Sequence, residues 1–315
     1  MTETIVNPIV EQRADPWIMR HTDGYYYFTA SLPDFSGIPL RRAQTLGELT
    51  GAEEKVVWQK RSTGIMSANI WAPELHYIQG KWYLYFAAAR EDAIFDHRMY
   101  VLENGSANPL EGEWVEKGQI KTWKESFALD ATTFEHENRL YYIWAQKDPE
   151  IEGNSNLYIS EMENPWTLTG PQTMIATPEY TWEKVGFLVN EGPAVMKRNG
   201  HIYVTFSASA TNHNYCVGLL RIDEKEDMLD ATHWKKYPQP VLTTNESIRE
   251  YGPGHNSFTT LADGTGVIVY HARNYKEIEG DPLWDPNRHT YIRPFSWQGD
   301  MPIFKNRMVN EEVTR

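Results

Sequence analysis

The stretch NEGPAVMKRNGHIYVTFSAS (residues 190–209) contains two alternating apolar segments joined by a tight turn at Asn199–Gly200. Glycine and asparagine tolerate the positive φ angles that such turns require. Four other segments share this form of a turn followed by an aromatic-rich strand: DGYYYFTAS (23–31), GKWYLYFAA (80–88), NRLYYIWAQ (138–146) and GTGVIVYHA (264–272). Their turns lie about 60 residues apart, and a regular spacing of this size indicates a repeat architecture.

Each repeat continues with segments expected to form two more strands. The third strands are expected in IPLRRAQTL, HRMYVLENG, SNLYISEME, YCVGLLRID and HTYIRPFSW, and the fourth in VVWQK, EWVEK, QTMIA, HWKKY and MPIF. The sequence therefore predicts an all-β, five-bladed β-propeller with four antiparallel strands per blade. We expect one catalytic domain over residues 1–315, with blades that start near residues 14, 70, 129, 191 and 255. A β-sandwich and a β-helix are the rival architectures, but the spacing is too even for most sandwiches and too long for a β-helix coil.

The charge and composition exclude several classes of function. The net charge is −13 and no Lys/Arg cluster is present, so nucleic-acid binding is not expected. No apolar run approaches the length of a membrane helix, so no membrane partner is expected. Cys216 is the only cysteine, which excludes an intramolecular disulfide and a cysteine-based zinc site.

The first residues, MTETIVNPIVEQ, have no basic segment followed by an apolar one, as a secretory signal would. We therefore expect a cytoplasmic protein, although a secreted protein whose signal had been removed would look similar. The sequence does not determine the oligomeric state.

Ionisable residues open four of the five strands that precede the hairpin turns. Asp15, Asp130, Glu191 and His255 stand at nearly the same distance before their turns, whereas the second repeat has Ala72 there. In a propeller the first strand of each blade lines the central channel, so these four side chains should converge at one mouth of the channel. Any one of the acids alone could serve a turn or cap, but three acids and a histidine in common register favour a functional site.

Converging carboxylates can hold a metal ion or perform acid/base catalysis. A direct Ca²⁺ site needs six to eight oxygens, and no loop with closely spaced calcium ligands is present. Hydrolysis of a glycosidic bond needs one protonated carboxyl group and one carboxylate that activates water or attacks the sugar. A third carboxylate beside the acid would raise the pKa of that acid. The spacing alone does not decide which acid takes which role.

The sequence resembles glycoside hydrolase family 43. Five motifs carry the resemblance, in family order: ADPWI (14–18), IWAPEL (70–75), LDATTF (129–134), NEGP (190–193) and GPGHNSF (252–258). The resemblance implies an inverting mechanism, in which the two catalytic carboxyl groups stand about 6.5–9.5 Å apart. It implies that Asp15 is the general base, Glu191 the general acid and Asp130 the carboxylate that orients the acid and tunes its pKa.

The resemblance also implies that the chemistry needs no cofactor. In many members a Ca²⁺ or other cation lies in the channel, and the histidine that matches His255 approaches it largely through waters. We expect substrate contacts from Trp71, Trp17, Arg273 and Arg288. Core packing is the alternative for the two tryptophans, and a salt bridge is the alternative for each arginine.

Late motifs, YHARNY and GDPLWDPNRH, are similar to those of the exo-acting α-L-arabinofuranosidases of the family. The resemblance thus implies release of terminal L-arabinofuranose from arabino-oligosaccharides or arabinan, with α-1,5-linked chains as the expected substrate. A β-xylosidase and an endo-arabinanase are alternatives within the family. The β-xylosidases of the family often carry an additional C-terminal β-sandwich. The length of this chain does not accommodate one, so the β-xylosidase alternative is disfavoured. A non-catalytic carbohydrate-binding propeller is the alternative from another class.

Overall fold

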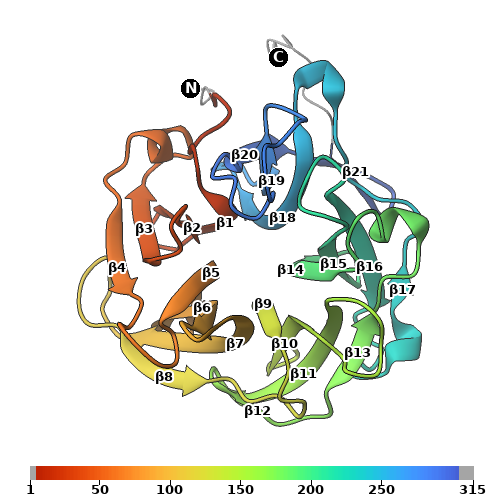
Figure 1. The fold of residues 1–315 in the computed structure, drawn as a ribbon, viewed down its shortest axis with the longest axis horizontal. Coiled ribbons are helices and arrows are strands. Elements are labelled where there is room, and N and C mark those ends of the chain that lie inside the picture. Colours follow the sequence, from red (N-terminus) through yellow and green to blue (C-terminus); the bar gives the residue numbers. More distant parts are fainter. Residues whose placement is uncertain (1–4, 305–315) are drawn as a thin grey trace.

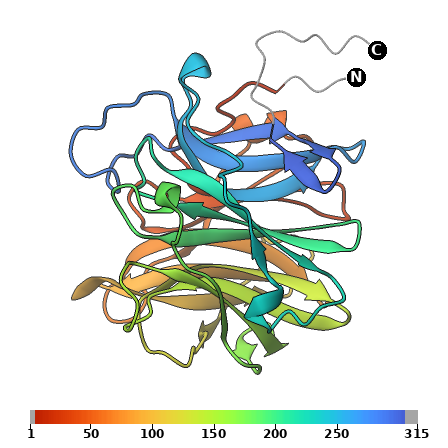
Figure 2. The ribbon, with the colours of Figure 1, turned by 90° about the vertical axis from the view of Figure 1, so that its right-hand side faces the viewer.

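Five β-sheets surround a central axis in the computed structural model, which describes residues 5–304 (Figure 1). The predicted five-bladed propeller is therefore confirmed. The innermost strands β1, β5, β9, β14 and β18 face one another across the axis. In the side view of Figure 2, the long loop between β19 and β20 (residues 274–288, blue) projects from one face of the disc.

The strands of each blade follow one another outward from the axis. Blade 1 has β1 (Ala14–Arg20), β2 (Tyr26–Ser31), β3 (Gly37–Ala43) and β4 (Lys55–Gln59). Blade 2 has β5 (Ala68–Ile78), β6 (Lys81–Arg90), β7 (Ala93–Asn104) and β8 (Val115–Gln119). Blade 3 has β9 (Ala128–His136), β10 (Arg139–Gln146) and β11 (Asn156–Asn164), and both β12 (Thr167–Leu168) and β13 (Thr173–Ala176) pair with β11. Blade 4 has β14 (Asn190–Arg198), β15 (His201–Ala208), β16 (Cys216–Asp223) and β17 (Lys235–Lys236).

Blade 5 departs from the predicted four strands. Its sheet has β18 (Tyr251–Thr260), β19 (Gly266–Arg273) and β20 (His289–Pro294). The segment MPIF, predicted as the fourth strand, instead contributes β22 (Met301–Ile303) to a separate hairpin with β21 (Ser296–Gln298). The outer side of β20 pairs with the N-terminal segment, through Ile9 N–H to Thr290 O (2.9 Å) and Thr290 N–H to Val10 O (2.8 Å). This pairing covers an open sheet edge and joins the last blade to the start of the chain.

The hairpin turns between first and second strands have the backbone that the sequence predicts. The φ angles are positive at Gly24 (88°), Gly80 (84°), Asn138 (61°), Gly200 (77°) and Gly264 (88°). In the part of the chain that the structure describes, the helical content consists of short 3₁₀ segments: η1 (Gly47–Thr50), η2 (Thr181–Glu183), η3 (Ala231–His233) and η4 (Glu246–Ile248). Within residues 5–304, no helix has the length and apolar character needed to cross a membrane.

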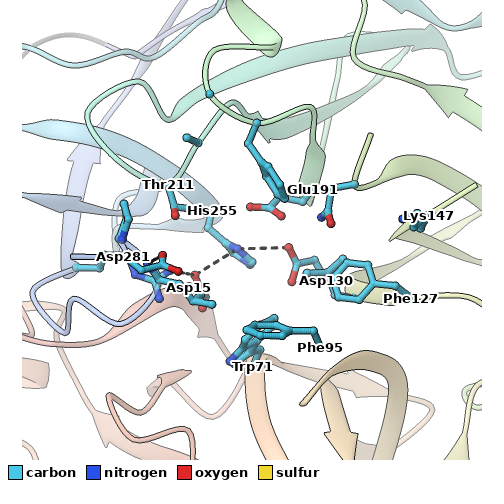
Figure 3. Close-up of a pocket in the computed structure, with 18 residues that line it drawn as sticks. Asp15, Trp71, Phe95, Phe127, Asp130, Lys147, Glu191, Thr211, His255 and Asp281 are labelled. Carbon is cyan, nitrogen blue, oxygen red and sulfur yellow. Dashed lines mark hydrogen bonds and ion pairs between the residues drawn. The ribbon is translucent and has the colours of Figure 1, made fainter. Parts of the chain in front are cut away.

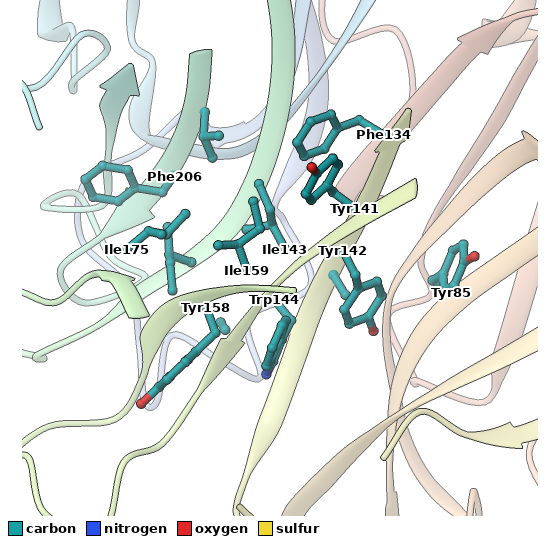
Figure 4. Packing of buried hydrophobic residues seen from close by; sticks show 14 of the residues in the cluster. Tyr85, Phe134, Tyr141, Tyr142, Ile143, Trp144, Tyr158, Ile159, Ile175 and Phe206 are labelled. Atoms are coloured by element: carbon teal, nitrogen blue, oxygen red, sulfur yellow. The ribbon is translucent and has the colours of Figure 1, made fainter. Parts of the chain in front are cut away.

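Aromatic side chains fill the space between the blades (Figure 4). Tyr142 and Trp144 of blade 3 are fully buried, and the Tyr85 ring of blade 2 lies 5.9 Å from that of Tyr142. The Tyr85 hydroxyl donates to the carbonyl of Pro165 at 2.7 Å, which satisfies the polar end of this buried ring. Burial of each such ring contributes about 1.5–3 kcal/mol. This packing holds neighbouring blades, and hence their innermost strands, in fixed relative positions.

Candidate active site

Each innermost strand is interrupted by an irregularity in its pairing with the second strand, near the residue that reaches the channel mouth. At that place the backbone is left-handed, with φ of 54° at Asp15, 46° at Ala72, 49° at Asp130 and 44° at His255. Such bulges bend a strand and redirect a side chain, and strained residues of this kind gather at functional sites.

In the fourth blade, the observed register differs by one residue from the register that the sequence predicts. There the left-handed residue is Gly192 (φ 55°), so Gly192 rather than Glu191 is equivalent to Asp15 and His255. Glu191 precedes the bulge and reaches the pocket from that place. A side chain at position 192 would contact His255, because an added Cβ would lie 3.2 Å from its Cγ. The glycine therefore leaves room for the histidine of the next blade.

The four predicted ionisable residues line one pocket of about 530 Å³ at the channel mouth (Figure 3). Asp15, Asp130, His255 and Glu191 come from four different blades, as the sequence predicts. The volume is typical of pockets that bind small ligands. Apolar side chains and a few polar groups make up the remaining wall: Trp71, Phe95, Phe127, Leu129, Lys147, Asn154, Gly186, Phe187, Ala210, Thr211, Asp281, Pro282, Leu283 and Arg288.

Asp15 lies in a dense set of polar contacts. The Ser31 hydroxyl donates to its Oδ2 at 2.6 Å, and Arg288 Nη1 lies 3.5 Å from its Oδ1. Burial alone would raise the pKa of Asp15, but the nearby His255 and Arg288 outweigh burial, and the pKa lies well below its usual value. Asp15 is therefore a carboxylate at neutral pH, ready to accept a proton.

Sequence analysis missed the groups that position Asp15. Ser31, Ser207 and His271 occupy the same place in the second strands of blades 1, 4 and 5, and each accepts a backbone N–H from the next blade. The acceptors and donors are Ser31 Oγ with Ala72 N–H (2.9 Å), Ser207 Oγ with His255 N–H (2.7 Å) and His271 Nδ1 with Asp15 N–H (3.1 Å). Burial lowers the pKa of His271 to about 3, which keeps Nδ1 an acceptor. The equivalent segments YFTAS (27–31), YVTFS (203–207) and VIVYH (267–271) each end in one of these acceptors.

Glu191 has an unsuspected partner in Tyr215. The buried Tyr215 hydroxyl donates to Glu191 Oε1 at 2.7 Å, and its ring stacks on His271 with 5.5 Å between centroids. A Cβ on Gly254 would lie 2.2 Å from the Tyr215 ring, so the glycine makes room for this tyrosine. Burial raises the pKa of Glu191 to about 7, the Tyr215 hydrogen bond opposes that rise, and the charge of Asp15 adds to it. Glu191 thus holds a proton that it can release near neutral pH.

Asp130 lies next to Glu191 and accepts the Gly192 N–H at its Oδ2 (3.1 Å). Burial raises the pKa of Asp130 well above its usual value, and the negative charges of Glu191 and Asp15 raise it further. Two buried carboxyl groups so close together cannot easily both ionise. Asp130 and Glu191 therefore form a pair that retains a shared proton in the neutral range.

His255 lies between two carboxylates rather than in an open metal site. Its Nδ1 is 3.4 Å from Asp15 Oδ1 and 3.6 Å from Asp130 Oδ2. Burial lowers the pKa of His255, and the negative charge of Asp15 opposes that shift. Among residues 5–304, no group of three or more His, Cys, Asp or Glu side chains converges as a set of metal ligands. A cation held by His255 through waters stays a prediction.

The structure separates the predicted substrate contacts into two groups. Trp71 and Arg288 line the pocket, but Trp17 and Arg273 do not. The Trp17 indole N–H donates to Leu75 O at 2.7 Å, and its ring packs 4.7 Å from that of His76. Arg273 is buried and donates to the carbonyls of Thr211 (2.7 Å) and Pro282 (2.8 Å). The Trp17 indole N–H and the two terminal nitrogens of Arg273 thus donate to backbone carbonyls, and a substrate contact by either residue stays a prediction.

The sequence profile described as Glycosyl hydrolases family 43 matches residues 5–302. The chain belongs to glycosyl hydrolase family 43. A family 43 relative from Streptomyces chartreusis, "Extracellular exo-alpha-(1->5)-L-arabinofuranosidase", is 56% identical over 88% of this chain and 84% of its own length. A protein of the same name from Streptomyces avermitilis is 52% identical over 94% of this chain. This chain spans 62% of that relative's length.

A solved structure of this fold, "alpha-L-arabinofuranosidase from Lactobacillus brevis", superimposes with a TM-score of 0.94 at 53% identity. The match covers 96% of this chain and 97% of that one. The similarity therefore extends over the whole propeller, including all five blades.

The names of the two Streptomyces relatives contradict the expected cytoplasmic location, because both are described as extracellular. We withdraw that expectation.

Proposed function

We propose that this chain is an inverting exo-α-L-arabinofuranosidase that releases terminal L-arabinofuranose from arabino-oligosaccharides or arabinan. The observation that carries the proposal is the pairing of an ionised Asp15 with a Glu191 whose pKa is raised to about 7, in one pocket. The names of the relatives support L-arabinofuranose as the sugar and an α-1,5 linkage. The propeller would act as one catalytic domain, with side chains and water as the only reactants besides the sugar.

Asp15 would act as the general base. Its low pKa keeps it ionised, and the hydrogen bond from Ser31 leaves Oδ1 directed toward His255 and Arg288. In the reaction, Asp15 removes a proton from a water that attacks the anomeric carbon opposite the leaving group. The positive charge of Arg288 favours the carboxylate form before the attack.

Glu191 would act as the general acid and protonate the glycosidic oxygen as the bond breaks. Asp130 would keep that proton available by sharing it with Glu191, because two adjacent buried carboxyl groups cannot easily both ionise. The Gly192 N–H holds the Asp130 carboxyl in place. When Glu191 has given up its proton, the Tyr215 hydroxyl stabilises the carboxylate that remains.

The loop between β19 and β20 supports an exo mode of action. Asp281, Pro282 and Leu283 of this loop form one wall of the pocket. Arg273 anchors the loop through the Pro282 carbonyl and lies 3.6 Å from Asp285, so the wall is braced from inside. A pocket with such a wall would admit the end of a chain, whereas an internal cut needs a groove open at both sides.

Trp71 and Arg288 would contact the sugar that is released. The Trp71 ring stacks on His97 at 3.9 Å between centroids, which fixes its orientation in the pocket wall. Aromatic rings bind the apolar faces of sugars, and a guanidinium group donates to their hydroxyls. Arg288 would thereby both stabilise the negative charge of Asp15 and bind the substrate.

The product profile tests the proposed function. We expect the protein to release arabinose, and no longer oligomers, from α-1,5-linked arabinotriose and from debranched arabinan. Mixed oligomers from arabinan would replace the exo mode by an endo mode. Chromatography of the early products distinguishes the two, and release of xylose from xylo-oligosaccharides alone would point to the β-xylosidase alternative.

Tyr215→Phe should move the alkaline limb of the pH profile to higher pH. In the wild type, kcat/KM should fall above about pH 7, because Glu191 loses its proton there. The Tyr215 hydrogen bond favours the ionised form, so its removal should raise the pKa of Glu191. The acidic limb belongs to Asp15 and should stay in place. If kcat/KM of Tyr215→Phe were lower at every pH but its alkaline limb stayed at the same pH, Tyr215 would serve only packing.

A further inference from the structure

We propose that a buried ion pair behind the active site, Glu183 with Lys236, positions the general acid Glu191 through Asn190. This inference rests on the proposed function and deepens it, because it adds residues that hold the acid without touching the sugar. Glu183, Asn190 and Lys236 do not line the pocket. Glu183 and Asn190 are fully buried, and the side chain of Lys236 is 7% exposed.

Lys236 connects the outer edge of blade 4 to its centre. It lies in β17, the outermost strand of the blade, whereas Asn190 begins β14, the innermost strand (Figure 1). The Lys236 ammonium donates to Glu183 Oε1 at 2.8 Å and to the Thr177 carbonyl at 2.7 Å. The centroid of the Phe206 ring lies 5.2 Å from this cation. The positive charge of Lys236 is therefore held inside the blade.

Glu183 is a fully hydrogen-bonded carboxylate. Its Oε2 accepts the backbone N–H groups of Glu179 (2.9 Å) and Tyr180 (2.7 Å), and its Oε1 accepts from Lys236 and from Asn190 Nδ2 (3.1 Å). A buried ion pair is no more stabilising than apolar side chains of the same size, because both charges lose their hydration. Stability alone therefore does not account for this cluster, and we assign to it the placement of Asn190.

Asn190 links the ion pair to the start of the innermost strand. Its amide binds both charges at once, because Nδ2 donates to Glu183 and Oδ1 lies 3.4 Å from Lys236 Nζ. Its backbone is bound to blade 3, since its N–H donates to Ser155 O at 3.0 Å and its carbonyl accepts from Ser155 Oγ at 3.0 Å. The side chain and the backbone of Asn190 are thus both fixed.

The acid Glu191 follows Asn190 directly and is fixed from its other side by the bulge. The next residue, Gly192, donates its N–H to Asp130 Oδ2. The backbone of Glu191 is therefore held at both neighbouring residues. A general acid must lie within about 2.6–3.2 Å of the oxygen that it protonates. A shift of this strand start by about 1 Å would therefore slow the proton transfer.

Two substrates separate the placement of the acid from the general stability of the blade. The leaving oxygen of α-1,5-linked arabinotriose needs a proton, whereas 2,4-dinitrophenolate leaves a 2,4-dinitrophenyl arabinofuranoside without one. Asn190→Ala removes the link and leaves the ion pair of Glu183 and Lys236 in place. We expect kcat for arabinotriose to fall about tenfold, while its KM and kcat for the activated substrate change by less than about twofold.

Lys236→Met tests the link from its other end. Methionine keeps the apolar stem, and Glu183 retains three N–H donors, so its carboxylate stays hydrogen-bonded. We expect a lower melting temperature and the same selective loss on arabinotriose. Arg293→Met is the matched control, because Arg293 forms a buried ion pair with Glu250 in blade 5. It should lower the melting temperature and leave the ratio of the two kcat values unchanged.

Each other outcome has a defined meaning. Equal losses on both substrates, or no loss on either, in Asn190→Ala and Lys236→Met would overturn the positioning role and leave the proposed function intact. A selective loss in Asn190→Ala alone would overturn the part of the ion pair, and an equally large change of ratio in Arg293→Met would overturn the assignment to this cluster. A wild type that cleaves neither substrate would overturn the proposed function and this inference with it. Thermal unfolding sets an assay temperature at which each variant is folded, and if one does not fold, the other decides.

Discussion

Glu191→Gln is expected to lower kcat for α-1,5-linked arabinotriose by about 10²–10⁴-fold and to change KM little. Glutamine keeps the size of the side chain and can still accept the Tyr215 hydrogen bond, but it has no proton to give to the glycosidic oxygen. The loss should therefore fall on the chemical step and spare substrate binding. Steady-state release of arabinose measures both constants, and thermal unfolding of the variant checks that the fold is intact.

A substrate with an activated leaving group separates this role from all others. 2,4-Dinitrophenolate leaves without a proton, so Glu191→Gln should retain far more of its activity on a 2,4-dinitrophenyl arabinofuranoside than on arabinotriose. Equal losses on both substrates would exclude Glu191 as the acid. A wild type that binds arabino-oligosaccharides without cutting either compound would instead be the non-catalytic carbohydrate-binding propeller.

The repeat of the hairpins was sufficient to predict the fold, because each turn needs a residue that accepts positive φ and each second strand needs buried aromatic side chains. The fifth blade shows where this reasoning ends. The segment MPIF has the apolar pattern of a strand, but such a pattern does not identify the strand with which it pairs. Residues 9 and 10 occupy the edge of β20, and no local signal announces a pairing between segments so far apart in the chain.

The candidate site also contains residues that could be predicted from the sequence and residues that could not. Asp15 and Asp130 could be located because they stand nine and eight residues before their hairpin turns, and the structure places a bulge at both residues. Glu191 was placed one residue out of register, since its true counterpart Gly192 has no side chain to reveal it. Tyr215 could not be found, because its contact with Glu191 depends on space left by Gly254 in the next blade. The sequence could not show that Arg273 lies outside the pocket wall, because an arginine near a loop has the same local sequence whether it faces sugar or backbone.

Asp15→Asn should be the other severe variant, because Asp15 is the proposed general base. Asparagine can still accept the Ser31 hydrogen bond through its amide oxygen, but it cannot take a proton from the attacking water. We expect kcat to fall by about 10²–10⁴-fold on arabinotriose and on the 2,4-dinitrophenyl arabinofuranoside alike, because both reactions need the activated water. This equal loss is the reverse of the pattern for Glu191→Gln, and the same two assays measure it.

The charge of Asp15 adds a second signature to this variant. Loss of the carboxylate removes a negative charge that raises the pKa of Glu191, so that pKa should fall. The residual activity of Asp15→Asn should therefore decline at lower pH than that of the wild type. The buried Arg288 also loses its counter-charge, so we expect a lower melting temperature. Preserved activity on the activated substrate would contradict the role of Asp15 as the base, whatever the melting temperature shows.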